Sequence, residues 1–236
     1  MQWKRWLRTA LKRAGLEVSR AGPDVASFLR SRNVRTVLDV GANIGQYGEY
    51  LRSLGYREEI VSFEPVRDVF AILRERAGPD PKWKVHPVGL GAEDGEATIN
   101  VSANPVFSSI LATRGAASRF DARAAPGRTE TITIHTLDRY VARCEAPIFI
   151  KIDTQGFERQ VLAGCDLSNP DIVGIQLELP VIHLYAGTWS ISEAIEHMAG
   201  KGFVISQLKP VNHHHMDRDA LVEIDCVFRR RSELDE

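Results

Sequence analysis

Small and acidic residues stand together where short apolar runs of this chain end. The run TVLDVG (36–41) leads into a turn in which Gly41 and Gly45 let the backbone approach a ligand closely. Asn43, between them, tolerates a left-handed turn. Glu64 ends the next run, at a place from which an acid can accept hydrogen bonds from ribose hydroxyls. These residue types in this order predict a site for a nucleoside.

The glycine spacing argues against two common nucleotide sites. It is G-x-x-x-G, which departs from the G-x-G-x-x-G of dinucleotide binding, and no G-K-[ST] follows as in a phosphate-binding loop. We therefore expect a nucleoside ligand that lacks a pyrophosphate, for which S-adenosylmethionine is the candidate. The same spacing disfavours an NAD-dependent oxidoreductase.

Two further carboxylates, Asp153 and Glu178, lie at the ends of later apolar runs. On adjacent strands both would point into one crevice. Carboxylates there can take a proton from a hydroxyl or ligate Mg²⁺. The sequence leaves both roles open, and we favour a site without metal because no third oxygen ligand stands near either acid.

Strands and helices alternate along the chain and must position these residues. In an open α/β sheet, ligands bind outside the carboxyl ends of the strands. The pattern predicts an α/β fold with a mostly parallel sheet, helices on both faces and one antiparallel C-terminal edge strand. The expected strands are 36–41, 59–65, 83–91, 96–102, 130–137, 147–156, 171–180, and a closing hairpin of 203–208 and 220–228 around a loop at 209–219.

Two segments stand apart from this alternation. Residues 1–20 carry Trp and Leu at helical spacing with Lys and Arg between them, which predicts a basic amphipathic helix. We assign residues 1–33 to an N-terminal arm and 34–236 to the body, with 103–128 as a loop insertion. The apolar face of the arm is expected to pack on protein, including a second copy in an oligomer, or to contact an anionic membrane surface.

The composition limits the kinds of partner and the cellular location that we expect. Lys and Arg number 30 against 31 Asp and Glu, so the net charge of −1 gives no whole-protein attraction to nucleic acid. No uninterrupted apolar run reaches the roughly 18 residues of a membrane-spanning helix. The three cysteines are far apart and form no C-x-x-C pair, which indicates free thiols in a reducing compartment. We expect a cytoplasmic protein, with peripheral membrane attachment through residues 1–20 left open.

The chain resembles the FkbM family of S-adenosylmethionine-dependent methyltransferases. The resemblance rests on VLDVGANIGQYG, FEP, VGLGAEDGEATINV, SSI, TLDRYV, FIKIDTQGFERQVLAG, QLELPVIHLY and the closing ID-CVF strand, which cover roughly residues 34–228. The family is usually described with D-V-E-G where this chain has D-T-Q-G (153–156). Roles given to that acid elsewhere are therefore not carried to Gln155.

The resemblance implies a Rossmann-like class I methyltransferase fold and a residue set for S-adenosylmethionine. Asp39, Gly41 and Asn43 would line the methionine end, Glu64 would hold the ribose, and the loop 88–90 would border the adenine. The full cofactor set expected is Asp39, Gly41, Asn43, Gly45, Tyr47, Glu64, Gly89, Leu90 and Asp153.

The resemblance also implies methyl transfer to a small-molecule or glycan acceptor, and we expect a hydroxyl of a sugar, a glycan or a glycosylated natural product. Candidates for the catalytic groups are Asp153, Glu178 and His183, with His135 as a further possible base. Expected substrate contacts are Ser108, Ser109, Lys151, Gln155, Tyr185 and His214.

Three alternatives stay open or are disfavoured. One is a non-catalytic module of the same fold that binds the cofactor or a partner. Another is a Mg²⁺-dependent O-methyltransferase of small molecules. Methylation of nucleic-acid bases is disfavoured, because the strand at 147–156 lacks the Asn/Asp-Pro-Pro-aromatic end typical of such enzymes.

Overall fold

The computed structural model describes residues 6, 10, 11, 13, 23–102, 108–111, 126–214 and 217–232. Most of the predicted amphipathic helix and most of the 103–128 segment therefore lie outside the described residues. None of the helices in the described parts of the chain is long and apolar enough to cross a membrane.

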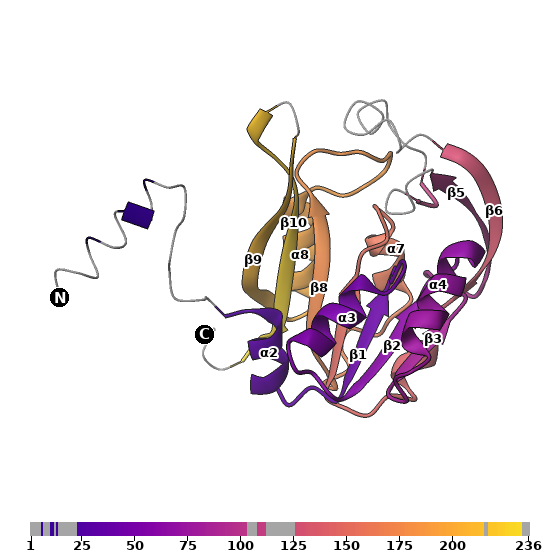
Figure 1. Cartoon of the computed structure of the whole chain (residues 1–236), viewed down its shortest axis with the longest axis horizontal. Coiled ribbons are helices and arrows are strands. Elements are labelled where there is room, and N and C mark those ends of the chain that lie inside the picture. The colour runs from indigo at the N-terminus through magenta and orange to yellow at the C-terminus, as the bar shows by residue number, and fades with distance from the viewer. Residues whose placement is uncertain are drawn as a thin grey trace.

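A seven-stranded sheet forms the centre of the molecule (Figure 1). Its strand order is β3-β2-β1-β7-β8-β10-β9, and the pairs from β3 to β8 are all parallel. Short, fully buried strands such as β1 explain the continuous apolar runs of the sequence. The strands are β1 (Thr36–Val40), β2 (Glu59–Phe63), β3 (Trp83–His86), β7 (Ile148–Ile152), β8 (Ile172–Pro180), β9 (Phe203–His214) and β10 (Asp217–Arg230).

The C-terminal hairpin differs from the sequence prediction in two ways. The antiparallel strand is β10, and it lies one place in from the edge, between β8 and β9. The segment predicted as a loop at 209–219 instead continues both strands, apart from residues 215 and 216, which are not described. The residues in this part of β9 are nearly all exposed, so the sequence here does not alternate between apolar and polar residues as in a half-buried strand. Pro210 fits there because an edge strand tolerates a missing N–H.

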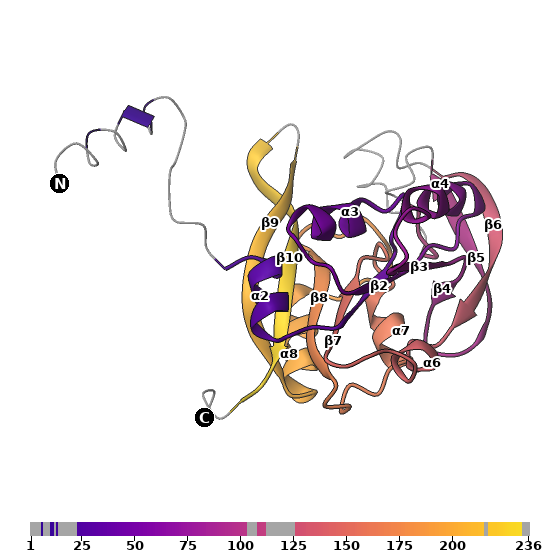
Figure 2. The ribbon, with the colours of Figure 1, turned by 60° about the horizontal axis from the view of Figure 1, so that its bottom comes forward.

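Helices cover both faces of the sheet (Figure 2). On one face, α2 (Val25–Ser31), α3 (Gln46–Ser53) and α4 (Arg67–Ala77) pack against side chains such as Val37, Ile60 and Phe149. On the other face, α6 (Asp138–Val141), α7 (Glu158–Ala163) and α8 (Ile191–Gly200) pack against Leu38, Val61 and Ile150. Neighbouring strand residues thus alternate between two cores, as side chains on a strand must.

The helix α2 lies within the range assigned to the N-terminal arm, yet it packs on the sheet. Asp24 caps its first turn by accepting a hydrogen bond from the Ser27 amide at 2.7 Å. Phe28 and Leu29 are buried, and the Phe28 ring lies 5.4 Å from the ring of Phe149, centroid to centroid. The division of the chain at residue 33 stays a prediction, with this helix attached to the body.

A second, three-stranded sheet covers one end of the first, in the order β4-β6-β5. Its strands are β4 (Gly89–Leu90), β5 (Gly95–Ser102) and β6 (Pro126–His135). The single strand predicted at 83–91 is therefore wrong: it breaks at Pro87, which has no N–H to donate, and β3 and β4 join different sheets. β6 begins inside the predicted loop insertion, and an isolated bridge brings Ser109 back against Asn100 of β5.

Candidate functional site

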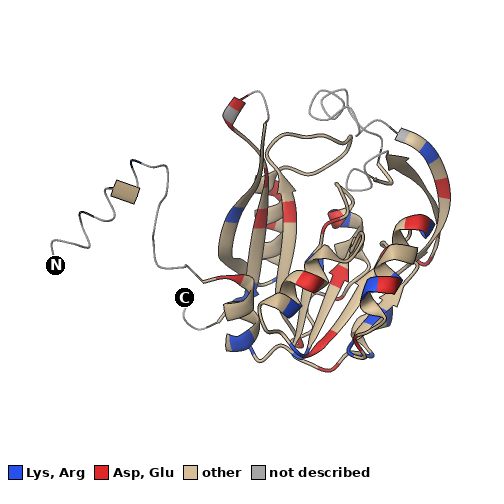
Figure 3. Ribbon diagram, in the orientation of Figure 1, with Lys and Arg blue, Asp and Glu red and all other residues tan. Residues whose placement is uncertain are grey.

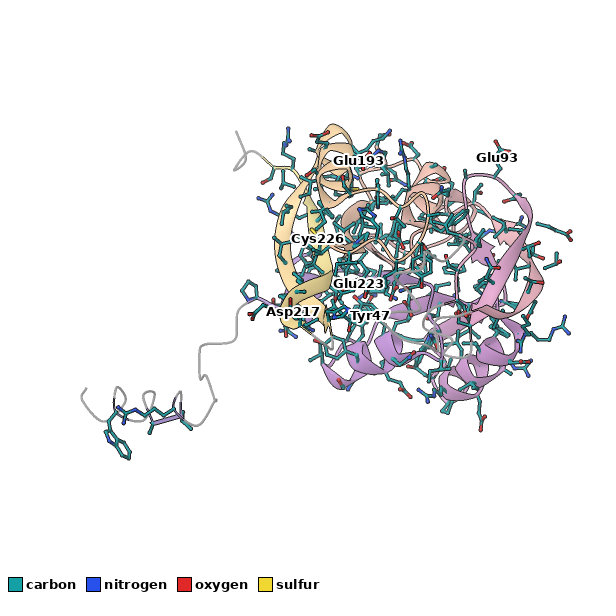
Figure 4. All side chains as sticks on the ribbon, turned by 90° about the horizontal axis from the view of Figure 1, so that it is seen from above. Tyr47, Glu93, Glu193, Asp217, Glu223 and Cys226 are labelled. Atoms are coloured by element: carbon teal, nitrogen blue, oxygen red, sulfur yellow. The ribbon has the colours of Figure 1, made fainter. Side chains whose placement is uncertain are left out.

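A cavity of about 670 Å³ opens at the carboxyl ends of β1, β2, β7 and β8. β4, β5 and β6 form one wall, and α3 with β9 and β10 forms the opposite wall. Seen from above, Tyr47 and Glu223 lie toward the middle of the body, whereas Glu93 lies at its rim (Figure 4). Of the residues predicted from the sequence, those that line the cavity are Gly41, Asn43, Tyr47, Glu64, Gly89, Leu90, Ser108, Ser109, Lys151, Asp153, Gln155 and Glu178.

The turn after β1 brings backbone rather than side chains to the cavity. Gly41 and Asn43 have φ angles of 74° and 50°, in the left-handed region. A Cβ atom added at Gly41 would lie 1.8 Å from the carbonyl oxygen of Asp153, so only glycine lets β1 and β7 end so close together. The turn can therefore hold a ligand against main-chain atoms.

Glu64 presents a carboxylate to the cavity from the end of β2. Its Oε2 accepts the amide of Asn43 at 3.0 Å, and its Oε1 accepts the amide of Val66 at 2.9 Å. Burial raises the pKa of Glu64 to about 7, although the two amide hydrogen bonds oppose the rise. The two amide hydrogen bonds fix the carboxylate in place. Because each of its oxygens has a second lone pair, it can still accept hydrogen bonds from two neighbouring hydroxyls.

Lys151 joins two carboxylates at the base of the cavity. Its Nζ lies 3.4 Å from Oδ1 of the fully buried Asp39 and 3.2 Å from Oδ2 of Asp153. Burial opposes the charge of Lys151, but the Asp153 and Asp39 carboxylates outweigh it and raise the pKa of Lys151. Burial also raises the pKa of Asp39, against the attraction of Lys151. The ammonium thus neutralises much of the negative charge beneath the site.

Gln155 lies between the two carboxylates that were expected to do chemistry. Its Nε2 donates to Oδ1 of Asp153 at 2.9 Å and to Oε1 of Glu178 at 3.1 Å, and its Oε1 accepts from Tyr185 at 3.0 Å. Burial raises the pKa of Glu178 well above its ordinary value, and Asp153 together with the acids of β10 raises it further. The pair therefore combines an ion-paired carboxylate with one that binds a proton readily.

A model of the methyltransferase FkbM domain matches residues 39–205, more than half of the chain. The chain belongs to the FkbM methyltransferase family. This match confirms the resemblance read from the sequence, and it makes the chain an S-adenosylmethionine-dependent methyltransferase with an α/β class I fold. No curated protein matches the chain.

Solved structures of several methyltransferases are similar to this FkbM-family chain. A putative RNA methyltransferase from Pyrococcus horikoshii is 13% identical, with 88% of this chain and 81% of that chain covered and a TM-score of 0.48. An rRNA methylase from Streptococcus thermophilus is 10% identical, with 91% and 100% covered and a TM-score of 0.48. A TehB-like S-adenosylmethionine-dependent methyltransferase from Corynebacterium glutamicum is 13% identical, with 98% and 96% covered and a TM-score of 0.41. The acceptors named for these proteins are not carried to this chain.

The cavity of this FkbM-family chain fits S-adenosylmethionine by size and chemistry. Its volume lies within the range of small-molecule sites. Glu64 offers carboxylate oxygens that could accept hydrogen bonds from ribose hydroxyls, and Val88, Leu90 and Ile132 offer an apolar surface of the kind that an adenine ring requires. Asp153, which also lines the cavity, offers a carboxylate that would attract a positively charged sulfur.

Five predicted residues do not line this cavity. Asp39 is buried beneath it, and Gly45 is the N-cap residue of α3, where an added Cβ would meet Leu73 and Trp83. Tyr185 donates a hydrogen bond to Gln155, which does line the cavity. The remaining two are His183, whose Nδ1 is hydrogen-bonded to Thr188, and His214, at the end of β9 opposite Asp217. His135, the further candidate base, is hydrogen-bonded to Tyr140 and does not line it either.

The structure adds residues that were not predicted. Gln176 accepts a hydrogen bond from Tyr47 Oη at 2.9 Å and lines the cavity with Asp225. Asp225 lies opposite Glu178 in the β8–β10 pairing, and acidic residues stand side by side on these strands (Figure 3). A signal existed in the sequence, since Asp225 is an acid within an otherwise apolar run, ALVEIDCVF. The pairing that brings it to the site could not be read from the chain.

Glu158 is a further unpredicted residue, and it shapes the turn after β7. Its Oε1 accepts from the Thr154 amide at 3.0 Å, the Thr154 hydroxyl at 3.1 Å and the Gly156 amide at 3.0 Å. Burial raises the pKa of Glu158 to about 7 against these hydrogen bonds. An acid at the first position of a helix was the available signal. Its carboxylate holds the D-T-Q-G segment in the shape that the site requires.

Metal ligation was the alternative role for the acids. Within the described ranges, no group of three or more His, Cys, Asp or Glu side chains is arranged to hold a metal ion. Between Asp153 and Glu178, the place that a cation would take is held by the Gln155 amide nitrogen. The donor set of the described residues therefore suits proton transfer better than Mg²⁺ binding.

Proposed function

We propose that this methyltransferase transfers a methyl group to a hydroxyl of a sugar, a glycan or a glycosylated natural product. The observation that carries the proposal is the pair of carboxylates, Asp153 and Glu178, held together by Gln155 at the cavity. A sugar hydroxyl is a weak nucleophile, so removal of its proton during transfer raises the rate. A carboxylate whose pKa is raised is suited to that task.

Glu178 is the group that we assign as general base. Its Oε1 is bonded to Gln155, which leaves Oε2 for the proton of the acceptor hydroxyl. Because burial and neighbouring acids raise the pKa of Glu178, it binds the proton more firmly than an exposed carboxylate would. Asp153, ion-paired with Lys151, lies beside it and shares the Gln155 amide.

Polar side chains on the β8–β10–β9 wall support an acceptor with several hydroxyls. Gln176 and Asp225 line the cavity next to Glu178, and Gln207 and Lys209 line it from the edge strand β9. Amide, carboxylate and ammonium groups together offer both donors and acceptors. A sugar, whose hydroxyls each donate and accept, can satisfy such a wall.

Positioning of the acceptor hydroxyl against the methyl group is the second contribution that we propose to the rate of methyl transfer. When bound, S-adenosylmethionine supplies a methyl group on a positively charged sulfur. The chain's own residues bind the acceptor, exclude water from the crevice and direct one hydroxyl toward Glu178. Holding reacting groups about 3 Å apart and aligned is worth several kcal/mol of barrier.

The first test combines donor binding with product analysis. Calorimetry should detect binding of S-adenosylhomocysteine, and methyl-labelled S-adenosylmethionine should give methyl ethers with a panel of saccharides and glycosylated products. The Glu178→Gln variant should lose about 10²- to 10⁴-fold in kcat while it keeps its affinity for S-adenosylhomocysteine.

Three outcomes would contradict the proposal. Label on nitrogen or carbon would replace the acceptor class. Donor binding without transfer to any component of a cell extract would favour the non-catalytic module. Loss of transfer with a chelator, restored by Mg²⁺, would favour the metal-dependent alternative.

A further inference from the structure

We propose that Gln155 is a positioning residue that holds Asp153 and Glu178 as one hydrogen-bonded unit and keeps Glu178 available as a base, so that it is not a substrate contact. This inference rests on the proposed role of Glu178. It differs from the expectation drawn from the sequence, which placed Gln155 among the residues that touch the acceptor.

Three of the four hydrogen-bonding positions of the Gln155 amide are taken by the protein itself. Both of its N–H bonds point to carboxylates, at 2.9 Å to Asp153 and 3.1 Å to Glu178. Its oxygen accepts the hydroxyl of Tyr185 at 3.0 Å. The opposite orientation of the amide would face its oxygen toward two carboxylates, so the acids fix which end carries the donors. Little of the group remains for a substrate.

The backbone under Gln155 is held as firmly as its side chain. Gln155 has a φ of 53°, which an L-residue keeps only where the surroundings impose it. The Ser109 hydroxyl donates to the Gln155 carbonyl at 2.8 Å. At the next position, a Cβ added to Gly156 would lie 2.5 Å from Thr188, so the turn is closely packed. The side chain therefore leaves the backbone at a fixed place between the two acids.

The charges around Glu178 explain why its carboxylate needs a hydrogen-bond donor. Lys151 acts on it from β7 and Asp153 from the turn that follows, whereas Glu223 and Asp225 act on it from β10. Lys151 is shared with the buried Asp39 and with the carbonyl of Gly41. The acids thus outnumber Lys151, and the Gln155 amide supplies a neutral hydrogen-bond donor directly at the Glu178 oxygen.

An amide at position 155, in place of an acid, matters because of these surrounding negative charges. A hydrogen bond donated to an ionised carboxylate favours the ionised form and lowers its pKa. A carboxylate at position 155 would instead set a third negative group between the first two. The D-T-Q-G sequence therefore allows the two acids to lie together without a cation between them.

The test compares two substitutions that keep the length of the side chain. Gln155→Met removes both donors, and Gln155→Glu replaces them with a negative charge; both are L-residues and carry the same backbone strain at φ 53°. Loss of the donor raises the pKa of Glu178, so the acid limb of the kcat/KM profile should move to higher pH. We expect about one pH unit for the Met variant and more for the Glu variant.

A titration that needs no turnover separates this inference from the proposed function. In the S-adenosylhomocysteine complex, the ¹³C signal of the Glu178 carboxyl, assigned by its loss in Glu178→Gln, should titrate at higher pH in both Gln155 variants. Gln176→Met is the matched control, because it makes the same change at another residue that lines the cavity, one whose side-chain oxygen accepts from Tyr47, and it should not raise that midpoint.

The outcomes are distinct. If Glu178→Gln keeps full activity, the proposed base is wrong, and the carboxyl titration still decides the role of Gln155. If the Glu178 midpoint is the same in wild type and Gln155→Met, the positioning role is wrong. A kcat/KM profile that falls equally at every pH would point instead to a substrate contact at Gln155 and would also overturn the inference.

Discussion

Lys151 and Asp39 form an ion pair directly beneath the cavity, with 3.4 Å between Nζ and Oδ1. Asp39 has no exposed surface, and its Oδ2 accepts a hydrogen bond from Ser62, which in turn accepts one from the indole of Trp83. The residue expected to touch the cofactor thus anchors the strand ends that carry the site. It acts on the cavity by fixing Lys151.

Removal of Lys151 should be costly because it leaves Asp39 buried without a counter-ion. We expect Lys151→Met to lower the free energy of unfolding by about 3–5 kcal/mol at neutral pH, measured by urea denaturation. The double variant Asp39→Asn/Lys151→Met should recover part of that loss. The control is Lys84→Met, which breaks an exposed pair with Glu59 and should cost about 1 kcal/mol or less. Equal losses for the two lysines would contradict this account.

Gly41 should tolerate no side chain, for a reason that goes beyond its backbone angle. Gly41→Ala would place a Cβ 1.8 Å from the Asp153 carbonyl oxygen in addition to the strain at φ 74°. Gly55→Ala carries a similar strain, at φ 88°, with nothing within 4 Å of the new atom. We expect about 1–2 kcal/mol for Gly55→Ala and clearly more for Gly41→Ala, compared by thermal and urea unfolding. Similar losses in both variants would show that the close approach of β1 and β7 is unimportant.

Glu64 should govern the affinity for the methyl donor, S-adenosylmethionine, and for its product. Glu64→Gln keeps the shape of the side chain but loses the charge that would strengthen hydrogen bonds from ribose hydroxyls, and its NH₂ group cannot accept one of the two backbone amides that hold Glu64. We expect the Kd of S-adenosylhomocysteine to rise about 10- to 100-fold, measured by calorimetry. Glu58→Gln, which changes an acid paired with Arg35 and Lys82 away from the cavity, should leave the Kd unchanged. An unchanged Kd in Glu64→Gln would remove Glu64 from the ribose site.

Glu158 should make the protein less stable as pH rises. Burial raises its pKa from an ordinary 4.5 to about 7, so the unfolded chain loses this proton before the folded chain does. The stability linked to the group is complete below pH 4.5 and is lost as pH rises through about 7. Glu158→Gln should therefore gain on wild type over this range, by up to roughly 3 kcal/mol. Urea unfolding from pH 4.5 to 8 tests this, with the exposed Glu196→Gln as control; a constant difference across this range would contradict it.

The sequence predicted the part of the fold in which buried strands alternate with helices. Buried strands such as 36–41 and 59–65 read clearly because both faces are covered, and their order along the chain indicated a mostly parallel sheet. The hairpin β9–β10 was harder, because the outer half of β9 is exposed and its polar residues resemble a loop. The break at Pro87 was visible in the sequence, but the assignment of β4 to another sheet depends on contacts with β6, far along the chain.

The sequence by itself determined the family, the donor and the strand ends where chemistry takes place, since these follow from local motifs such as DVGANIG, FEP and KIDTQG. Only the tertiary structure decided how their side chains divide the work. It buried Asp39 beneath the cavity, set Gln155 between Asp153 and Glu178, and placed Asp225 opposite Glu178. These relations depend on pairing between distant strands and on burial, which no local pattern of residues specifies.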